Sequence, residues 1–346
     1  MSKLVSYASA IREAFHYLLS RYPEVFVIGQ GLWSPWYVGS SMKDLDREFG
    51  TERIIDTPVS ELACTGTAIG ASLFGYRPIV VHPRMDFMLL AVDQIVNQAA
   101  KWRHMLGGAA TPAVTIRGII NRGGEQGAQH SQALHAWFAH IPGLRVVVPA
   151  TPSDARDLLI ASVLCDDPVI YIDDRWLYGL VEELSAVTER DLRTEGPGVR
   201  RPGTDLTIVG AGYSAHLACQ AAEKLAVEAG IEAEVVDVRV VSPLDARPIV
   251  HSVRRTGRLL VVDGGWAHCG LARSIVAEVV ETLDPSELCS SPVIVTLPAA
   301  PAPTSRTLER LYYPGVEEVV KKALGLCARR GCEGARAVPS EAAQAP

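Results

Sequence analysis

The sequence predicts an α/β protein with two successive domains, each built around a largely parallel sheet. At 346 residues the chain is longer than the roughly 250–300 residues that one hydrophobic core usually organises. Short β-branched runs alternate with longer helical stretches along the chain, which is typical of parallel sheets covered by helices. A polar, turn-rich segment at 186–205 separates two such series and has the composition of a linker.

The first domain is expected over residues 1–185. Apolar residues recur at helical spacing over 8–19, and a buried strand at 25–28 follows and ends at Gly29. A helix that leads into a buried strand in this way is typical of a parallel sheet. The remaining predicted elements are strands at 78–81, 113–116, 144–148 and 168–172, and helices at 61–74, 87–106 and 152–164.

The second, smaller domain is expected over residues 206–330. It repeats the alternation of strands and helices and ends in a helix at 315–326. Residues 331–346 are rich in Ala, Pro, Ser, Gln and Glu and are predicted to form a flexible tail. The other predicted elements are strands at 206–209, 233–236, 259–262 and 293–295, and helices at 214–229, 243–254 and 270–283.

Composition and charge exclude several classes of protein. With 48% hydrophobic residues the chain is not a disordered one, and a net charge of -6 argues against a nucleic-acid partner. We find neither a run of about 18 apolar residues that could span a membrane nor a secretory leader pattern. The seven cysteines lack paired zinc-ligand spacing and are expected to be reduced thiols. We therefore expect a globular protein of the cytoplasm.

Three loops after predicted strands hold unusual residues. Ligands of an open parallel sheet bind beyond the carboxyl ends of its strands, so these loops are candidate sites. Glu61 opens a helix after the turn at 57–60, where it is either a partner of the helix dipole or part of a site. Phe87 follows another strand and is either a core or a site residue. The glycine-rich loop 122–132 delivers His130, and its glycines allow close approach of a ligand.

A fourth loop, Gly210 to Ala215, fits the dinucleotide-binding pattern G-x-G-x-x-A at the start of a helix. Asp237 ends the next strand and is a candidate partner for a ribose. The motif is short, and glycines at any strand-to-helix turn would produce it, so a nicotinamide or flavin site is only an alternative interpretation. The sequence contains no P-loop, nucleophile elbow or H-E-x-x-H zinc helix.

Seven segments, spread in order along the chain, carry patterns that belong together. They are RIIDTPVSE at 53–61, MDF at 85–87, DQIVNQAAK at 93–101, QHSQ at 129–132, PGL at 142–144, VVSPLD at 240–245 and DGGW at 263–266. These segments resemble the β subunit of the thiamine-diphosphate-dependent 2-oxoacid dehydrogenase decarboxylase component, over nearly all of residues 4–326. The resemblance implies a transketolase-like architecture, in which a pyrimidine-binding domain precedes the transketolase C-terminal domain.

The resemblance also implies a cofactor and roles for four residues. Thiamine diphosphate becomes a nucleophile when its own aminopyrimidine removes the C2 proton. Glu61 matches the family's glutamate that hydrogen-bonds to N1′ of this ring and favours its imino tautomer. Phe87 matches the aromatic residue that stacks on the pyrimidine, and Val59 would line the same pocket. His130 matches the active-site histidine that faces the substrate and the acyl acceptor.

Some residues near the implied cofactor depart from the family pattern. Gln30 stands where the family usually has an acid after the first strand, and we expect it to line the cofactor site. Pro83 and Arg84 replace a common Glu-Phe/Ile-Met/Gln neighbourhood. These departures put the substrate and the acceptor in question more than the cofactor.

The family commonly carries a monovalent cation site made by backbone carbonyls. By the same resemblance, K⁺ would bind near Val163, Cys165 and Asp167. Cys165 replaces a residue that is usually acidic, so this chain departs from the family pattern here as well.

The motif that binds Mg²⁺ and the diphosphate in this family is missing from this chain. The family's other subunit carries a G-D-G…N-N motif that holds Mg²⁺ and the diphosphate, and nothing in this sequence resembles it. The chain is therefore expected to hold half of a cofactor site at an interface with an α subunit, in an α2β2 tetramer. We expect little activity from the chain alone.

The function that this resemblance implies is decarboxylation of a 2-oxoacid, followed by transfer of the acyl group to a lipoyl transacylase. Gln129, His130 and Ser131 look closer to pyruvate- or acetoin-type members than to branched-chain members. One alternative is a specialised two-subunit enzyme that transfers a two-carbon unit to another acceptor without lipoate. A second alternative is a non-catalytic, β-like structural or regulatory partner, against which the presence of Glu61, Phe87 and His130 argues.

Overall fold

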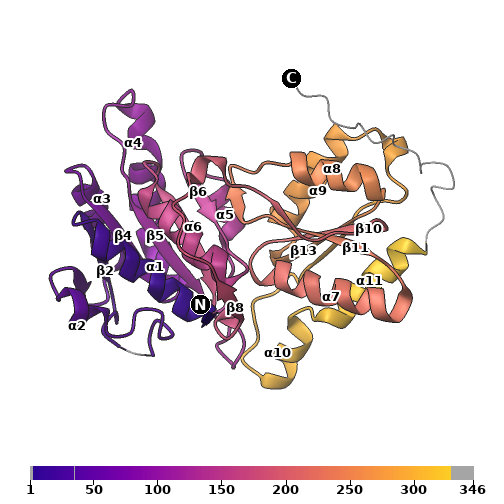
Figure 1. The fold of residues 1–346 in the computed structure, drawn as a ribbon, viewed down its shortest axis with the longest axis horizontal. Coiled ribbons are helices and arrows are strands. Elements are labelled where there is room, and N and C mark those ends of the chain that lie inside the picture. Colours follow the sequence, from indigo (N-terminus) through magenta and orange to yellow (C-terminus); the bar gives the residue numbers. More distant parts are fainter. Residues whose placement is uncertain (1–2, 35, 329–346) are drawn as a thin grey trace.

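The computed structural model describes residues 3–34 and 36–328. Figure 1 shows two α/β lobes side by side, the first in indigo to magenta and the second in orange to yellow. The tail predicted at 331–346 lies outside the described residues. Among the helices that are described, not one combines the length and the apolar character that crossing a membrane requires.

A seven-stranded sheet forms the first lobe. In spatial order its strands are β12 (Val240–Ser242), β6 (Arg145–Val147), β7 (Val169–Asp174), β5 (Thr115–Ile120), β4 (Arg77–His82), β2 (Val25–Gly29) and β3 (Ile54–Asp56). Every neighbouring pair is parallel except β12 with β6. Strands β5 and β7 are buried along their whole length, because helices cover both faces of a parallel sheet. The predicted α/β class is confirmed.

The long helices of this lobe begin where their capping residues indicate. The Ser6 hydroxyl accepts a hydrogen bond from the backbone of Ser9 at the start of α1 (Tyr7–Arg21). Thr151 caps α6 (Pro152–Leu164) in the same way, and a proline occupies its first turn. The lobe also contains α2 (Leu45–Phe49), α3 (Glu61–Ser72), α4 (Ala100–Met105), α5 (His135–Ala139), and a two-stranded antiparallel sheet of β1 (Lys3–Ser6) and β8 (Val181–Leu184).

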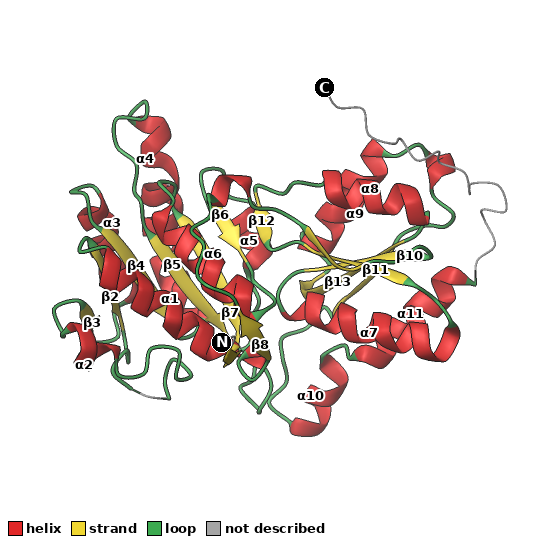
Figure 2. Cartoon of the chain, viewed as in Figure 1, coloured by secondary structure: helices red, strands yellow, loops and turns green. Residues whose placement is uncertain are grey.

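The second lobe has a five-stranded sheet of β14 (Val293–Leu297), β13 (Leu259–Trp266), β10 (Leu206–Gly210), β11 (Ala233–Asp237) and β9 (Gly198–Arg201), in that spatial order. Only β9 runs antiparallel to its neighbour. Figure 2 shows red helices on both sides of these yellow strands. The helices are α7 (Tyr213–Ala229), α8 (Arg247–Thr256), α9 (Leu271–Thr282), α10 (Arg306–Tyr312) and α11 (Val316–Cys327).

The segment predicted as one helix at 87–106 is helical but divided. It consists of a 3₁₀ helix at Met85–Ala91, a π-helix at Gln94–Ala99 and then α4. Met85, Met88 and Ala91 are buried, and their spacing of three residues matches the three residues per turn of a 3₁₀ helix. A hydrophobic pattern with a period of 3.6 residues predicts a helix but does not distinguish the 3₁₀, π and α geometries.

The two lobes share strands and core. Part of the predicted linker at 186–205 forms β9 in the second sheet, and β12, which follows β11 in the chain, crosses to the edge of the first sheet. One apolar cluster contains Val148 and Ile170 of the first lobe and also Val209 and Val236 of the second. The first lobe is therefore completed by the second.

The expectation of reduced cysteines is met only in part. Cys289 is disulfide-bonded, so for this residue the prediction was wrong. Free thiols in the described chain are those of Cys64, Cys165, Cys219, Cys269 and Cys327.

Candidate active site

The predicted site residues lie on loops at the carboxyl edge of the first sheet. Glu61 follows β3, Phe87 follows β4 and His130 follows β5, and these three strands run in one direction. The loop after β2, which contains Gln30, runs along the lower edge of the first lobe in Figure 1. This is the edge at which parallel sheets bind their ligands.

Glu61 is the first residue of α3, and its side chain is only 7% exposed. Within residues 3–34 and 36–328 its carboxyl group has neither a hydrogen-bond donor nor a basic partner. The backbone dipoles at the start of a helix favour a carboxylate. The carboxyl group of Glu61 is therefore available to a group from outside the described chain.

Phe87 and His130 form an aromatic pair. Their ring centroids are 5.2 Å apart and the rings are nearly perpendicular, at 86°. Both side chains are half-buried. Helix α3, which carries Glu61, packs against the 3₁₀ helix that carries Phe87. The structure thus pairs the flat apolar ring with the imidazole, and the helix that begins with the acid packs against the 3₁₀ helix of that ring.

Asp86 is a second buried acid at this position, and the sequence analysis did not single it out as a site residue. Its Oδ1 atom accepts hydrogen bonds from the backbone N–H and the side-chain amide of Gln132, at 3.1 and 2.9 Å. Its Oδ2 atom is buried without a partner in the described chain, and burial raises the pKa of this carboxyl group above its ordinary value. The sequence did contain a signal for Asp86, because it is the acid between two apolar residues in the MDF motif at 85–87, which is part of the family resemblance.

The loop that carries His130 is held from the second lobe. The backbone N–H of Glu125 donates to both carboxylate oxygens of Glu309 on α10, at 3.2 Å each. Glu125 and Gly127 have positive φ angles of 63° and 73°, so the chain turns sharply here. A Cβ atom on Gly127 would lie 2.7 Å from the Thr304 hydroxyl, and together with the positive φ this close approach favours glycine here. Helix α10 therefore fixes the path of the loop.

His82, at the end of β4, links the sheet to α3. Its Nε2 atom lies 3.2 Å from the Thr65 hydroxyl, and both residues are buried. Burial lowers the pKa of His82 to about 4, since a charged imidazole would lose its hydration there. His82 is therefore neutral at pH 7 and anchors the helix one turn after Glu61.

Gln30 and Val59, the other two residues implied to line the cofactor, lie in different environments. Gln30 is half-buried, and its Nε2 atom donates to the Tyr37 hydroxyl at 3.1 Å, whereas its Oε1 atom is buried without a partner in the described chain. Val59 is 72% exposed on the turn before α3. Gln30 thus has an acceptor directed at no protein group, and Val59 faces outward beside Glu61.

The carbonyls implied to hold K⁺ already have a cationic partner. Arg77 Nη1 donates to the carbonyl oxygens of Val163 and Cys165 at 3.0 and 3.1 Å. The Asp167 carboxylate is paired with Arg103 and Arg145. A guanidinium therefore satisfies two of the groups expected to bind the ion, and in the described chain no three His, Cys, Asp or Glu side chains cluster as metal ligands would.

The glycines of the dinucleotide-like motif have a packing explanation. A Cβ atom on Gly210 would lie 2.7 Å from the backbone of α7, and one on Gly212 would lie 2.8 Å from Val148. Asp237 is fully buried, and its carboxylate accepts hydrogen bonds from the Arg200 guanidinium at 2.8 and 3.0 Å. The small residues permit close helix–strand contact, and the acid is engaged in an ion pair instead of being available to a ribose.

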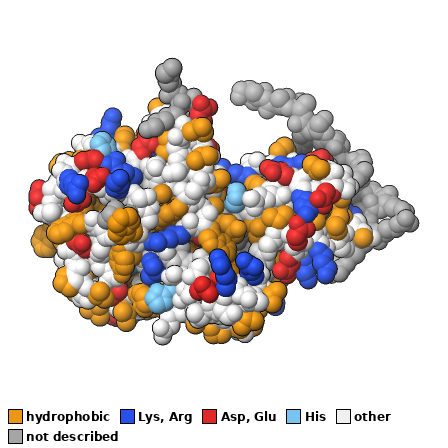
Figure 3. All heavy atoms as spheres, turned by 90° about the horizontal axis from the view of Figure 1, so that it is seen from below, with side chains coloured by type: hydrophobic (Ala, Val, Ile, Leu, Met, Phe, Trp, Pro, Cys, Tyr) orange, Lys and Arg blue, Asp and Glu red, His pale blue; other side chains and the backbone are white. Residues whose placement is uncertain are grey.

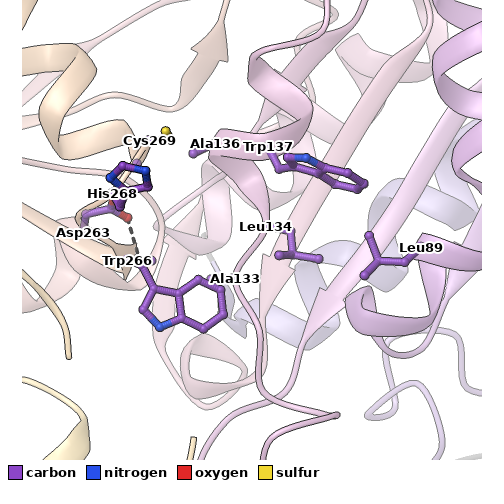
Figure 4. Close-up of a pocket in the computed structure, with 11 residues that line it drawn as sticks. Leu89, Ala133, Leu134, Ala136, Trp137, Asp263, Trp266, His268 and Cys269 are labelled. Atoms are coloured by element: carbon purple, nitrogen blue, oxygen red, sulfur yellow. Dashed lines mark hydrogen bonds between the residues drawn. The ribbon is translucent and has the colours of Figure 1, made fainter. Parts of the chain in front are cut away.

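A cavity of about 280 Å³ lies between the two lobes. Figure 4 shows Trp266, His268 and Cys269 of the second lobe on one side of it and Leu89, Leu134 and Trp137 of the first lobe on the other. Neither Glu61 nor His130 lines this cavity, although Leu89 belongs to the 3₁₀ helix of Phe87. The cavity is thus adjacent to the candidate site and separate from it.

Exposed apolar side chains surround α3. Within the described chain, Val59 and Leu62 are 72% and 54% exposed at its start, and Phe74 is 85% exposed just after its end. Leu90, on the 3₁₀ helix packed against α3, is 60% exposed. An apolar surface of this kind beside an unpartnered buried acid is typical of an interface with another chain.

Two family matches cover most of the chain. Residues 3–179 match the transketolase pyrimidine-binding domain, and residues 198–319 match the transketolase C-terminal domain. Among solved structures, the chain is similar to a split-gene transketolase described as an inactive β4 tetramer, with a TM-score of 0.72 and 24% identity, covering 94% of this chain and 99% of that one. This structural likeness shows the fold.

Sequence relatives are more similar. The chain is 40% identical over 333 residues to subunit beta of the acetoin:2,6-dichlorophenolindophenol oxidoreductase of Cupriavidus necator, which covers 93% of this chain and 97% of that protein. It is 35% identical to the Bacillus subtilis protein of the same name, covering 94% and 98%. It is 33% identical to the pyruvate dehydrogenase E1 component subunit beta of Rhizobium meliloti, covering 92% and 69%.

Proposed function

Because this chain belongs to the transketolase-like family that contains the β subunits of pyruvate and acetoin dehydrogenases, we propose that it acts with an α subunit to decarboxylate a pyruvate-like 2-oxoacid. In this proposal the chain supplies half of a thiamine diphosphate site. The observation that carries the proposal is Glu61, a residue that is only 7% exposed and whose carboxyl group has no partner in the described chain, at the carboxyl edge of the sheet.

The residues present fit the pyrimidine half of the cofactor. When bound, thiamine diphosphate supplies a carbon nucleophile that attacks the 2-oxo group and then accepts the electrons released by decarboxylation. Glu61 would hydrogen-bond to N1′ of the pyrimidine and hold the proton that its imino tautomer requires. Phe87 would pack on the face of that ring, with Val59 and Gln30 at its margin. His130 would move a proton to or from the substrate.

The partner would supply the other half of the site. We infer that an α subunit covers the apolar surface around α3 and contributes the groups that hold the diphosphate and Mg²⁺, in an α2β2 tetramer. The exposure of Val59 and Leu62 beside Glu61 supports this arrangement. Because Arg77 already occupies the expected carbonyl oxygens, the proposal includes no K⁺. The cytoplasmic location expected from the sequence stays a prediction.

The acceptor of the acyl group is proposed to be the lipoyl arm of a transacylase. The alternative is a two-subunit enzyme that transfers a two-carbon unit to a different small molecule. This alternative is favoured by Gln30 and Arg84, because both depart from the family pattern at the edge of the sheet where the substrate would bind. The two acceptors are distinguished by supplying the reconstituted enzyme with a lipoyl domain and measuring its reductive acylation.

The proposed function is tested by mixing the chain with a candidate α subunit, thiamine diphosphate and Mg²⁺ and measuring CO₂ release from pyruvate. We expect activity from the pair and little from either chain alone. Glu61→Gln should lower kcat by about 10²–10⁴-fold, the usual contribution of acid–base catalysis. Glu52→Gln, which changes an exposed glutamate that precedes β3, is the control. A Glu61→Gln enzyme as active as the control would refute the proposal and favour a structural role.

A further inference from the structure

Two arginines and a glutamine converge on Tyr37 at the carboxyl edge of the first sheet. Arg84 follows β4, and its guanidinium carbon lies 6.0 Å from the centre of the Tyr37 ring. Arg175 follows β7, and its Nη2 atom donates to the Tyr37 carbonyl oxygen. Gln30 follows β2, and its Nε2 atom donates to the Tyr37 hydroxyl at 3.1 Å. Three strands thus deliver two positive charges and an amide to one residue.

Neither of these guanidiniums has a carboxylate partner in the described chain. Arg84 donates only to the carbonyl oxygen of Pro83, at 3.0 Å, and Arg175 only to that of Tyr37. The Nε atoms of both arginines are buried without an acceptor. Two other arginines of this lobe, Arg117 within β5 and Arg122 just after it, are each paired with a buried aspartate. The absence of a partner therefore distinguishes Arg84 and Arg175 from their neighbours.

The two charges also destabilise each other. Burial, and after it the neighbouring Arg175 guanidinium, lower the pKa of Arg84 below its ordinary value. Both side chains are half-buried, so water screens their repulsion less than at an open surface. A bound anion would relieve the repulsion and provide the missing acceptors.

The cluster lies beside the candidate site. The backbone N–H of Phe87 donates to the carbonyl oxygen of Arg84 at 3.2 Å, so one short turn connects the two residues. Figure 3 views the molecule from below, onto the edge along which the loop after β2 runs, and basic side chains gather near the middle of this face. A ligand group held by Arg84 would therefore belong to a molecule that extends toward Phe87.

We propose that Arg84 and Arg175, with Gln30, bind an anionic group, a carboxylate or a phosphate, carried by the small-molecule substrate or acceptor of this site. Planar guanidiniums with free N–H groups suit the paired oxygens of both anions. This inference rests on the proposed function and deepens it, since it assigns residues of this chain to an anionic group of the reactants.

The first experiment needs no catalysis. The isolated chain is titrated with inorganic phosphate, malonate and acetate at low ionic strength, and binding is measured by calorimetry. We expect phosphate and malonate to bind at one site per chain and acetate to bind at least ten-fold more weakly. The double variant R84Q/R175Q should lose at least ten-fold in affinity for phosphate. Arg273→Gln, which changes an exposed arginine on α9, should bind as the wild type does. Phosphate binding that is absent, or unchanged in the double variant, would overturn the proposal.

Conservative variants guard against misfolding. R84K and R175K keep both charges and lose the planar fork, so their affinity for phosphate should fall between those of the wild type and the glutamine variant. Circular dichroism and thermal melting establish whether each variant is folded. If the lysine variants bind no better than the glutamine variant while remaining folded, the fork geometry carries the recognition.

A second experiment distinguishes a small-molecule ligand from an acid of the α subunit. Phosphate binding is measured again on the α–β complex. We expect the affinity to be retained, and in an active complex KM for the anionic reactant should rise at least ten-fold in R84Q/R175Q with kcat little changed. If the complex no longer binds phosphate, the arginines belong to the subunit interface and the proposal is overturned. Because phosphate binding needs no turnover, failure of the proposed function does not obscure this result.

Discussion

At the scale of single residues, several polar atoms at the carboxyl edge of the first sheet have no partner in the described chain. In the described chain, Gln30, Arg84, Asp86 and Arg175 each have a buried polar atom without a hydrogen bond, and Glu61 has a carboxyl group without a partner. Native proteins satisfy most buried polar groups, because each unpaired one costs about 1–3 kcal/mol. A ligand and a partner chain that hydrogen-bond to these groups would remove the free-energy cost of leaving them unpaired.

His82 makes the stability of the folded chain depend on pH. Burial lowers its pKa from 6.5 to about 4. Between these pH values His82 is therefore protonated in the unfolded chain but mostly neutral in the folded chain. The stability present above pH 6.5 is then lost progressively, by on the order of 3 kcal/mol down to pH 4. Urea unfolding at several pH values should show a flatter decline for His82→Gln, which keeps a polar atom near Thr65.

The control for this prediction is the exposed His104. His104→Gln should retain the full decline of stability between pH 6.5 and pH 4 that the wild type shows. Equal declines for His82→Gln and the wild type would mean that His82 titrates alike in the folded and unfolded chains.

The sequence identified the acid, the aromatic residue and the histidine of the candidate site but not the polar groups around them. Glu61, Phe87 and His130 lie within ordered patterns shared with a family. The unpaired states of Arg84 and Arg175 depend on which carboxylates lie nearby, and these come from strands far apart in the sequence. No local pattern shows that Arg117 pairs with Asp173 whereas Arg175 has no carboxylate partner among the described residues.

At the scale of elements, regular helices and buried strands were predictable and short edge elements were not. Helix α6 has the predicted bounds, because Thr151 and Pro152 mark its start and an apolar pattern fills it. Strands β9 and β12 have only four and three residues and form by pairing with β11 and β6. Their strand conformation depends on pairing with distant segments of the chain, which the β-propensity of their own residues does not reveal.

Helix α10 provides a prediction at this scale, because Glu309 holds the loop of His130. Glu309→Ala removes the acceptor of the Glu125 N–H and should reduce the free energy of unfolding by about 1–2 kcal/mol. The loop at 122–132 should also be cleaved several-fold faster in limited proteolysis. Urea unfolding and the cleavage rate check the two effects, with the exposed Glu281→Ala as control. An unchanged cleavage rate would show that the loop keeps its path without α10.

At the scale of the whole molecule, the two predicted domains share one of their large apolar clusters. One apolar cluster includes residues of both lobes, and β12 extends the first sheet although it follows β11 in the chain. The sequence indicated two series of elements divided by a linker, whereas β9 of that linker joins the second sheet and β12 of the second series joins the first. The sequence did not indicate this shared cluster, because an apolar residue type does not reveal whether its contacts come from its own lobe or from the other lobe.

This shared core predicts that the chain unfolds as one unit. If a protease site is inserted at the exposed residues 185–186 and cleaved, the halves should co-elute as one folded particle, because separation would expose Val148 and Val209 to water. Calorimetry of the intact chain should give a single transition, with a ratio of calorimetric to van't Hoff enthalpy of about 1. Val241→Asp places a charge in the shared cluster and should let the cleaved halves separate. Halves that separate without this substitution would show that each lobe is stable alone, and the β subunit would then be a pair of independent domains.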